Sequence, residues 1–337
     1  MAASARPPIL GPMHAVTITS PGGPEALELA SLPDPVPGPG EVLIEVAAAG
    51  VNRADILQRQ GHYPPPPGAP DTLGLECSGV VAAVGRDVTG WRVGDRVAAL
   101  LDGGGYASLA VAPTAQLLRV PEHVDLIDAA GLPEAVCTVW SNLVMVGRLG
   151  AGQTVLVQGG SGGVGTVAIQ VAAALGARVA ATAGGPDRVH RCVELGAEIG
   201  LDHRTDDIVA ALRDATDGRG ADVILDVLGA GGLTANLRAL ATGGRLVIIG
   251  LQQGRRGEVD LGLLLARRAS IHGTTLRSRP AGEKAAIVAE ATAQAWPLLA
   301  EGRLSPVIHA RLPLAEAGRA HSMLASGEVF GKVLLLP

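Results

Sequence analysis

Residues 154–165 constrain this chain most, because a short apolar strand runs directly into a glycine-rich turn and then into an apolar helix. Gly160, Gly162 and Gly165 fit the pattern G-x-G-x-x-G, which permits a tight turn, close approach of a pyrophosphate to backbone N–H groups, and close helix–strand packing. The helix predicted at 163–175 directs free N–H groups and the positive end of its dipole at the phosphates. The stretch therefore predicts a dinucleotide site, with Gly160, Ser161, Gly162, Gly163, Val164 and Gly165 as its binding residues.

In a chain with 47 glycines, the alternative to a dinucleotide site is an ordinary glycine turn. The sequence pattern that follows the turn favours the dinucleotide site. Six apolar segments alternate with helical stretches, as in a doubly wound parallel sheet whose first strand precedes the glycine turn. The predicted strands are 155–158, 178–182, 199–202, 222–227, 245–249 and 270–275, and the helices between them include 187–195, 205–215 and 232–240.

The chain on either side of this sheet has a different pattern. Residues 14–120 show short strands separated by Gly and Pro, which predicts an all-β module with strands at 14–19, 41–47, 79–84, 96–99 and 106–111. Around 125–147 the period changes toward that of a helix, which marks a domain boundary. A helix at 283–300 and a strand, helix and strand at 307–310, 314–325 and 332–336 do not extend the alternation. We expect this tail to return to the first domain, so that the nucleotide domain is an insertion.

Composition narrows the class of protein. With 47% apolar residues and a net charge of -5, the chain is expected to be a soluble globular protein without the basic field that nucleic acid or an anionic membrane requires. No apolar run reaches the roughly 18 residues of a membrane span. Cys77, Cys137 and Cys192 are far apart and odd in number, which favours a reduced, cytoplasmic protein. Residues 1–12 lack a signal-peptide core and are interpreted as a flexible extension, with Met13 as a second candidate start.

The end of the second predicted strand indicates which dinucleotide binds. In NAD-binding sheets an acidic residue there accepts hydrogen bonds from the adenosine ribose, whereas residues 180–185 contain no acid. Arg188 on the next helix and His203 and Arg204 after the third strand place cations where a 2′-phosphate would lie. Asp187 offers an alternative, because it could pair with Arg188. We therefore predict NADP(H) rather than NAD(H), bound here by Gly184, Gly185, Arg188, His203 and Arg204.

Motifs along nearly the whole chain resemble the medium-chain dehydrogenase/reductase superfamily. They lie at 21–25, 40–42, 50–55, 74–76 and 93–97 and at the glycine turn. A second set resembles the zinc-free quinone oxidoreductase branch, in particular the group of animal NADPH quinone oxidoreductases induced by a tumour suppressor and their bacterial relatives; it lies at 52–55, 58–61, 63, 65–69, 133–135, 276–279 and 331–332. The resemblance implies a GroES-like catalytic domain at 13–127 and 275–337, split by a Rossmann domain at 128–274. It also implies a homodimer joined through strand 270–275.

The chain departs from the alcohol-dehydrogenase branch at the catalytic zinc site. Where that branch has a Cys and a His-Glu pair, this sequence has Asn52 and Leu75-Glu76, and the four-cysteine structural lobe is absent. A tetrahedral zinc site requires three protein ligands in an enzyme, and a lone Glu76 does not supply them. We therefore expect no metal.

Without a metal, the chemistry predicted is direct hydride transfer to an electrophilic conjugated carbonyl, and a quinone fits. By resemblance, Asn52 and Tyr63 lie near the nicotinamide and contact the quinone as catalytic residues. The alternatives are a turn residue for Asn52 and a loop anchor for Tyr63. The resemblance also assigns cofactor contacts to Thr138, Leu276, Arg277, Ser278 and Lys332, and the end of the fifth strand adds Gly250, Leu251 and Gln252.

Two other functions stay open from sequence. One is NADPH-dependent reduction of the double bond of an enone, alkenal or enoyl thioester, because the same branch includes such reductases. The other is a non-catalytic NADPH-binding sensor. The expected partners are a small-molecule acceptor and a second copy of the chain, without nucleic acid or membrane.

Overall fold

The computed structural model describes residues 12–337, so the predicted extension at 1–12 lies outside the described residues except for Pro12. The chain divides into two compact units. The first, called here the β-rich unit, ends at Cys137 and resumes at Arg277–Ala300 and Pro306–Pro337. The second, called the parallel-sheet unit, comprises Thr138–Leu276 and Glu301–Ser305. The second unit thus interrupts the first along the chain.

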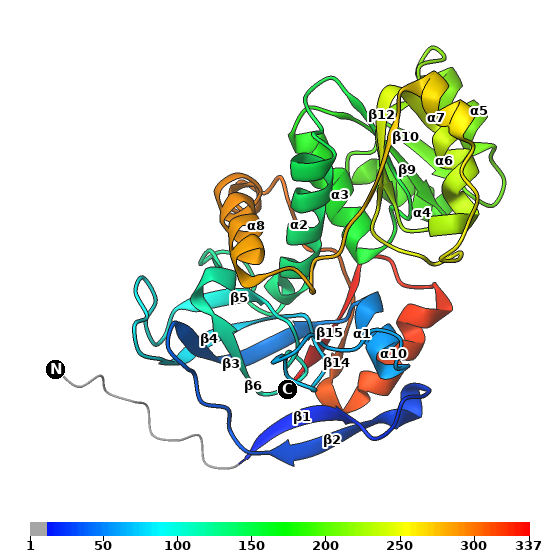
Figure 1. The fold of residues 1–337 in the computed structure, drawn as a ribbon. Coiled ribbons are helices and arrows are strands. Elements are labelled where there is room, and N and C mark those ends of the chain that lie inside the picture. Colours follow the sequence, from blue (N-terminus) through cyan, green and yellow to red (C-terminus); the bar gives the residue numbers. More distant parts are fainter. Residues whose placement is uncertain (1–11) are drawn as a thin grey trace. The chain divides into compact units, whose positions relative to one another are not determined.

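The β-rich unit is built on a seven-stranded sheet with the order β14-β15-β3-β4-β5-β7, in which β6 also pairs with β3. The C-terminal strand β15 pairs antiparallel with β3, so that the end of the chain joins a sheet whose other strands include β3 to β7 (Figure 1). The strands are β3 (Glu41–Gly50), β4 (Glu76–Val84), β5 (Arg96–Leu100), β6 (Leu109–Pro113), β7 (Leu117–Arg119), β14 (Ile308–Pro313) and β15 (Lys332–Leu336), and a separate pair is formed by β1 (Met13–Ile18) and β2 (Leu27–Leu32).

The prediction that residues 14–120 are all β is wrong at one place that matters for the site. Helix α1 (Arg53–Arg59) interrupts the strands, and Asn52 is its N-cap. The Asp55 carboxylate accepts a hydrogen bond from the Asn52 backbone N–H at 2.7 Å, as an acid at the third helical position does in a capping box. The spacing of Asn52 and Asp55 was therefore a helix-start signal available in the sequence.

The other helices of the β-rich unit lie in its C-terminal segments. They are α8 (Ala281–Gln294), α9 (Pro297–Ala300) and α10 (Ala317–Ser326). The core between them and the sheet is made of Val, Leu, Ile and Ala with few aromatic residues, and Tyr106 is among its largest fully buried side chains.

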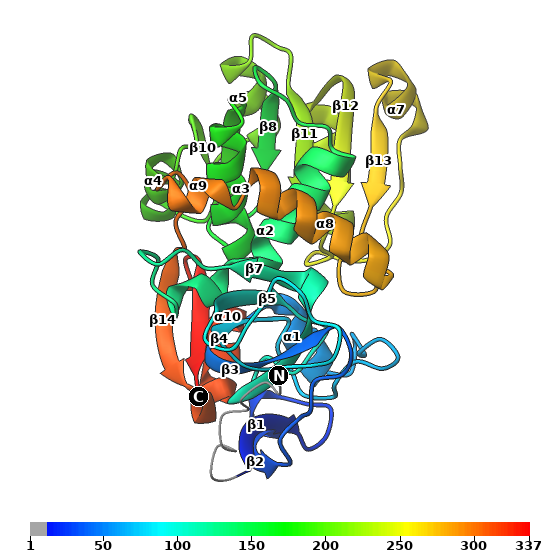
Figure 2. The ribbon, with the colours of Figure 1, turned by 90° about the vertical axis from the view of Figure 1, so that its left-hand side faces the viewer.

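The parallel-sheet unit has six parallel strands in the order β10-β9-β8-β11-β12-β13. Figure 2 shows β8, β11, β12 and β13 side by side in this order. Numbered along the chain this is the order 3-2-1-4-5-6 of a dinucleotide-binding sheet, which confirms the predicted fold class. All four residues of the central strand β8 are buried, as expected for a strand covered on both faces. The strands are β8 (Thr154–Val157), β9 (Arg178–Ala183), β10 (Ile199–Asp202), β11 (Ala221–Asp226), β12 (Leu240–Ile248) and β13 (Ser270–Gly273).

The helices of this unit connect its strands. They are α3 (Gly163–Ala174), α4 (Pro186–Glu194), α5 (Ile208–Ala215), α6 (Leu233–Ala239) and α7 (Leu261–Arg267). Helix α3 is apolar on nearly all sides, and most of its residues are buried, as expected for a helix packed into a core. Helix α2 (Pro133–Val139) and the π-helical segment Trp140–Val146 precede β8.

One expectation about apolar runs needs correction. The segment Asp128–Val146 is long and apolar enough to cross a membrane by length and composition, although the sequence analysis found no such run. Within it, 78% of the most apolar window is buried inside the protein. A buried core helix can have the same length and hydropathy as a membrane span. The burial of this segment is typical of a core helix.

Candidate functional site

The three glycines of the turn have different surroundings. A Cβ on Gly165 would lie 2.2 Å from the carbonyl oxygen of Gly159, and a Cβ on Gly160 would lie 3.1 Å from Cys192 Sγ. Gly165 therefore requires glycine for packing, whereas a Cβ at Gly160 would force the neighbouring side chains to shift slightly. At Gly162, the N-cap of α3, the nearest atom to a Cβ would be 3.4 Å away. The helix N-terminus is thus left open on the side where a phosphate binds such a turn.

A buried threonine from the neighbouring strand holds this turn. The Thr182 hydroxyl accepts the Gly159 N–H at 3.0 Å and donates to Gln158 Oε1 at 2.9 Å, while the Thr182 carbonyl accepts the Gly160 N–H at 2.7 Å. Gln158 in turn donates to Asn236 Oδ1 at 2.8 Å. The sequence does not predict this group of three polar residues, because nothing local to them indicates that their side chains meet.

Two basic side chains lie at the tip of β9. A Cβ on Gly184 would lie 3.0 Å from Arg204 Nε and 3.0 Å from the His203 ring, so both exposed side chains lie beside this glycine. Asp202 Oδ1 accepts the N–H groups of Gly185 and Arg204 at 3.0 Å, and these bonds lower the pKa of Asp202. Its carboxylate therefore orders the loop. Arg188 lies in α4, the helix that follows Gly185.

The remaining predicted residues of the parallel-sheet unit lie at several places. Gly250, Leu251 and Gln252 follow β12 at the carboxyl end of the sheet, where the Gln252 N–H donates to the Val227 carbonyl at 3.1 Å. Leu251 is 55% exposed there. Thr138 and Leu276, the first and last residues of the main segment of the unit, are buried.

The β-rich unit contains a buried polar cluster around Asn52. Its Oδ1 accepts from Lys332 Nζ at 2.6 Å, and its Nδ2 donates to Glu76 Oε1 at 2.9 Å. Lys332 also forms an ion pair with Glu76 Oε1, and the Glu134 N–H donates to Glu76 Oε2 at 2.9 Å. The structure thus brings together two predicted residues, Asn52 and Lys332, and adds Glu76 as the group that joins them.

This cluster does not fit a catalytic zinc ion. Both oxygens of Glu76 are already engaged by donors, one of them the ammonium group of Lys332. Burial raises the pKa of the adjacent Cys77 thiol to about 12, whereas zinc binds the thiolate. Within residues 12–337, no three His, Cys, Asp or Glu side chains are grouped so that they could hold a metal.

Glu134 is a second acid at this cluster that the sequence analysis did not assign. Burial and the negative charge of Glu76 raise its pKa to about 8. It is therefore largely protonated at neutral pH. The 133–135 motif was the available signal, but the motif does not reveal that two carboxyl groups approach each other.

Tyr63 and Arg277 form another pair within the β-rich unit. The Arg277 guanidinium lies 5.6 Å from the centroid of the Tyr63 ring, in the range of a cation–π contact. Arg277 is almost completely buried, and it donates to the Asp102 carbonyl at 2.7 Å and to Gln58 Oε1 at 2.8 Å. Burial raises the pKa of Tyr63, which keeps its hydroxyl protonated. Ser278 follows Arg277 in the chain.

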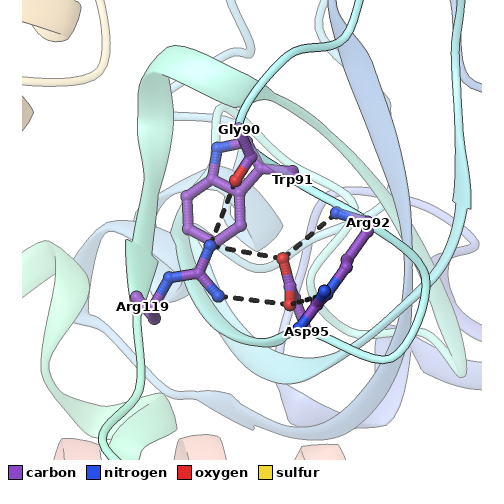
Figure 3. A pocket seen from close by; sticks show the side chains of 5 residues that line it. All are labelled: Gly90, Trp91, Arg92, Asp95 and Arg119. Carbon is purple, nitrogen blue, oxygen red and sulfur yellow. Dashed lines mark hydrogen bonds and ion pairs between the residues drawn. The ribbon is translucent and has the colours of Figure 1, made fainter.

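A surface hollow of about 340 Å³ lies elsewhere on the β-rich unit and is not part of this arrangement (Figure 3). Arg119 stacks on Trp91 with its guanidinium carbon 4.5 Å from the ring centroid, and Arg119 and Arg92 both pair with Asp95 (Figure 3). The charged groups that line the hollow pair with one another. We therefore interpret these residues as a contact that stabilises the fold and not as a binding site.

Comparison with known protein families agrees with both units. Residues 38–122 match the alcohol dehydrogenase GroES-like domain, and residues 163–293 match the zinc-binding dehydrogenase domain. A GroES-like domain interrupted by a dinucleotide-binding sheet defines the class of the medium-chain dehydrogenases/reductases.

Relatives narrow the class. The chain is 34% identical to the quinone oxidoreductase of Lama guanicoe over 96% of its own length and 97% of that protein. A crystal structure of Escherichia coli quinone oxidoreductase complexed with NADPH superposes with a TM-score of 0.87 at 28% identity, covering 96% of this chain and all of that one. A mycocerosic acid synthase-like polyketide synthase of Mycobacterium tuberculosis is 34% identical over 94% of this chain, which spans only 15% of that synthase. The chain belongs to the quinone oxidoreductase family of the medium-chain dehydrogenase/reductase superfamily.

Proposed function

We propose that this protein is an NADPH-dependent quinone reductase that works by direct hydride transfer without a metal. The observation that carries the proposal is the glycine turn, open at Gly162, together with the cations beside Gly184. The family relationship to quinone oxidoreductases, including one solved with NADPH, supports it. Bound NADPH supplies a hydride ion, which a quinone accepts together with a proton to become a hydroquinone.

The parallel-sheet unit provides the residues that would hold the dinucleotide. Backbone N–H groups at the start of α3 would bind the pyrophosphate, because they have no partner within the helix. Arg204, His203 and Arg188 would bind the 2′-phosphate, since residues 180–185 at the end of β9 contain no acid and the nearby Asp202 carboxylate is bound to the N–H groups of Gly185 and Arg204. The remaining proposed contacts are Thr138, Gly250, Leu251, Gln252, Leu276, Arg277, Ser278 and Lys332.

Tyr63 and Asn52 stay the proposed catalytic residues on the β-rich unit. The Tyr63 hydroxyl can donate to a quinone oxygen, and its ring can stack on the quinone. The Asn52 amide already accepts from Lys332 and donates to Glu76. A quinone oxygen would therefore have to share these hydrogen bonds, so that Lys332 and Glu76 set the orientation that Asn52 offers.

The second candidate is an NADPH-dependent reductase of an enone, alkenal or enoyl thioester. The match to a segment of polyketide synthases favours it as the alternative, because the same hydride donor would serve an activated double bond. The two functions differ in acceptor and not in cofactor.

The test is a parallel measurement of NADPH oxidation with a 1,2-quinone, a 1,4-quinone, an enone and an enoyl thioester. We expect the highest kcat/KM with a quinone, and NADPH to be preferred over NADH. A higher kcat/KM with the enone or thioester would select the alternative. Tight NADPH binding in calorimetry without oxidation by any acceptor would identify a nucleotide sensor instead.

We further propose a cytoplasmic homodimer joined through β13. This strand is the edge of its sheet, and the neighbouring helix α7 has no buried residue. Leu261 and Leu265 of α7 are 65% and 76% exposed. An unpaired edge beside exposed leucines is suited to pair with the same edge of a second copy.

A further inference from the structure

A chain of four buried polar side chains runs through the β-rich unit behind Asn52. Arg59 Nη1 lies 3.3 Å from His321 Nδ1, and His321 Nε2 lies 3.1 Å from the Tyr106 hydroxyl. That hydroxyl donates to Asp55 Oδ2 at 3.0 Å. None of the four residues is more than 3% exposed, so water does not reach the chain from outside.

The chemistry of Arg59 sets the direction of every hydrogen bond in this chain. A guanidinium has only donors, so His321 Nδ1 must be the acceptor and carry no proton. The neutral ring then has its proton on Nε2 and donates to the Tyr106 oxygen. Tyr106 is left with one hydrogen, which it gives to Asp55. Burial and the Arg59 charge lower the pKa of His321 to about 3, in agreement with a neutral ring.

The last acceptor of the chain holds the start of α1. Asp55 Oδ2 accepts the Asn52 backbone N–H at 2.7 Å in addition to the Tyr106 hydroxyl. Asn52 in turn contacts Lys332 and Glu76 through its amide. Asp55, one helical turn away, therefore holds the residue that carries this amide, and it does so most strongly when it is ionised.

We propose that Arg59, His321, Tyr106 and Asp55 are positioning residues. Their hydrogen bonds all run in one direction, so that Asp55 Oδ2 is always an acceptor. Asp55 thereby holds Asn52 where its amide bridges Lys332 and Glu76. The effect on turnover rests on the proposed quinone reductase function. The chain cannot reverse when Asp55 takes up a proton, because Arg59 has no lone pair with which to accept. Both the Tyr106 hydroxyl and the Asn52 N–H donate to Oδ2, so a proton taken up by Asp55 goes to Oδ1, which has no hydrogen-bond partner. The carboxyl then loses the negative charge that strengthens its bond to the Asn52 N–H, and its hold on Asn52 weakens.

The charged groups around Asp55 give this device its pH dependence. Besides Tyr106, the charges of Lys332 and Arg277 favour the ionised carboxylate, whereas that of Glu76 opposes it. Glu134 also faces Asp55, but its raised pKa keeps it protonated in this pH range. Burial is the largest influence and raises the pKa of Asp55 to about 6. Activity should accordingly fall as the pH drops through about 6.

The test uses the full-length Tyr106→Phe variant, which keeps the ring and removes the link between His321 and Asp55. Loss of a hydrogen bond to the charged form raises the pKa of Asp55 further. We expect kcat/KM with the best acceptor to fall about tenfold near pH 6 and less than about threefold near pH 8, with the NADPH Kd unchanged. Thr216→Val is the matched control, because it also removes a buried, hydrogen-bonded hydroxyl, which donates to the Leu212 and Arg213 carbonyls and accepts the Gly220 N–H. An equal loss at both pH values would overturn the proposal.

Two NMR measurements decide the proposal even if the protein reduces no acceptor or the variant fails to fold. In the wild type, ¹⁵N shifts should show His321 as the neutral Nε2–H form from about pH 5 to 8, and the Asn52 amide proton should follow the titration of the Asp55 carboxyl. A protonated His321, the Nδ1–H form, or an Asn52 signal that ignores Asp55 would overturn it. Absence of NADPH oxidation by the wild type would count against the proposed function alone.

Discussion

Lys332 and Glu76 form an ion pair inside the β-rich unit, with side chains that are 5% and 0% exposed. The two residues come from β15 and β4, which lie on either side of β3 in the sheet. Removing one partner of a buried pair leaves the other charge without compensation, and this typically costs more than the pair contributes.

Lys332→Met should therefore lower the free energy of unfolding by about 3 kcal/mol, as measured by urea denaturation. The double variant Lys332→Met/Glu76→Gln, which leaves no unpaired charge, should lose less than the sum of the two single variants. Strictly additive losses would show that the two residues are not coupled.

The glycine turn offers a matched pair of substitutions. Gly165→Ala should destabilise the fold by about 1–3 kcal/mol, because its Cβ would lie 2.2 Å from the Gly159 carbonyl oxygen. Gly162→Ala should keep its stability, since its Cβ meets nothing closer than 3.4 Å, but its NADPH affinity in calorimetry should fall at least about tenfold because the Cβ enters the phosphate side of the turn. Unchanged NADPH affinity in a folded Gly162→Ala protein would place the pyrophosphate elsewhere.

Arg204→Ala tests which dinucleotide the tip of β9 selects. Loss of one charge-assisted hydrogen bond to a 2′-phosphate should raise the KM for NADPH about tenfold and leave the KM for NADH unchanged. Arg219→Ala is the control, because Arg219 is also an exposed arginine but pairs with Asp222 at the start of β11. Equal effects on both cofactors would argue against a phosphate contact.

Glu134 should make the fold less stable as the pH rises. Its pKa is about 8 in the folded protein and 4.5 without burial, so the folded state holds the proton more tightly than the unfolded state. Stability contributed in this way is present at low pH and is lost between about pH 4.5 and 8. Glu134→Gln should flatten this decline in thermal unfolding at pH 5 and pH 8, whereas Glu198→Gln, at an exposed residue paired with Arg178, should not. The same decline in Glu134→Gln would assign it to another group.

Leu265→Glu should disrupt the proposed dimer. A charge on α7 would face the equivalent helix of a second copy and could not be buried there. Light scattering after size exclusion should report a dimer for the wild type and a monomer for the variant. Leu29→Glu, at an exposed leucine of β2, should stay dimeric. A monomeric wild type would contradict the proposal directly.

The spacing of residues along the chain was sufficient to predict the parallel sheet and its glycine turn, because local backbone geometry controls both. The strand, glycine turn and helix around Gly160, Gly162 and Gly165 follow from backbone constraints within a dozen residues, and the six alternating strands follow from periodicity. Helix α1 was missed although Asn52 and Asp55 carry a capping signal, because short strands on both sides dominated the pattern.

The part of the candidate site around Asn52, which we propose to contact the quinone, could not be predicted without the tertiary structure. Asn52 and Lys332 meet although they are 280 positions apart, and Arg59 and His321 meet although they are 262 apart. The roles proposed for Asn52 and Tyr63 stay predictions, but their partners are now defined. Sequence by itself determined the doubly wound sheet and its phosphate turn, because these are properties of neighbouring residues. Only the folded chain decided which charges are buried together and which way their hydrogen bonds run, because β15 and α10 bring Lys332 and His321 back to the first sheet.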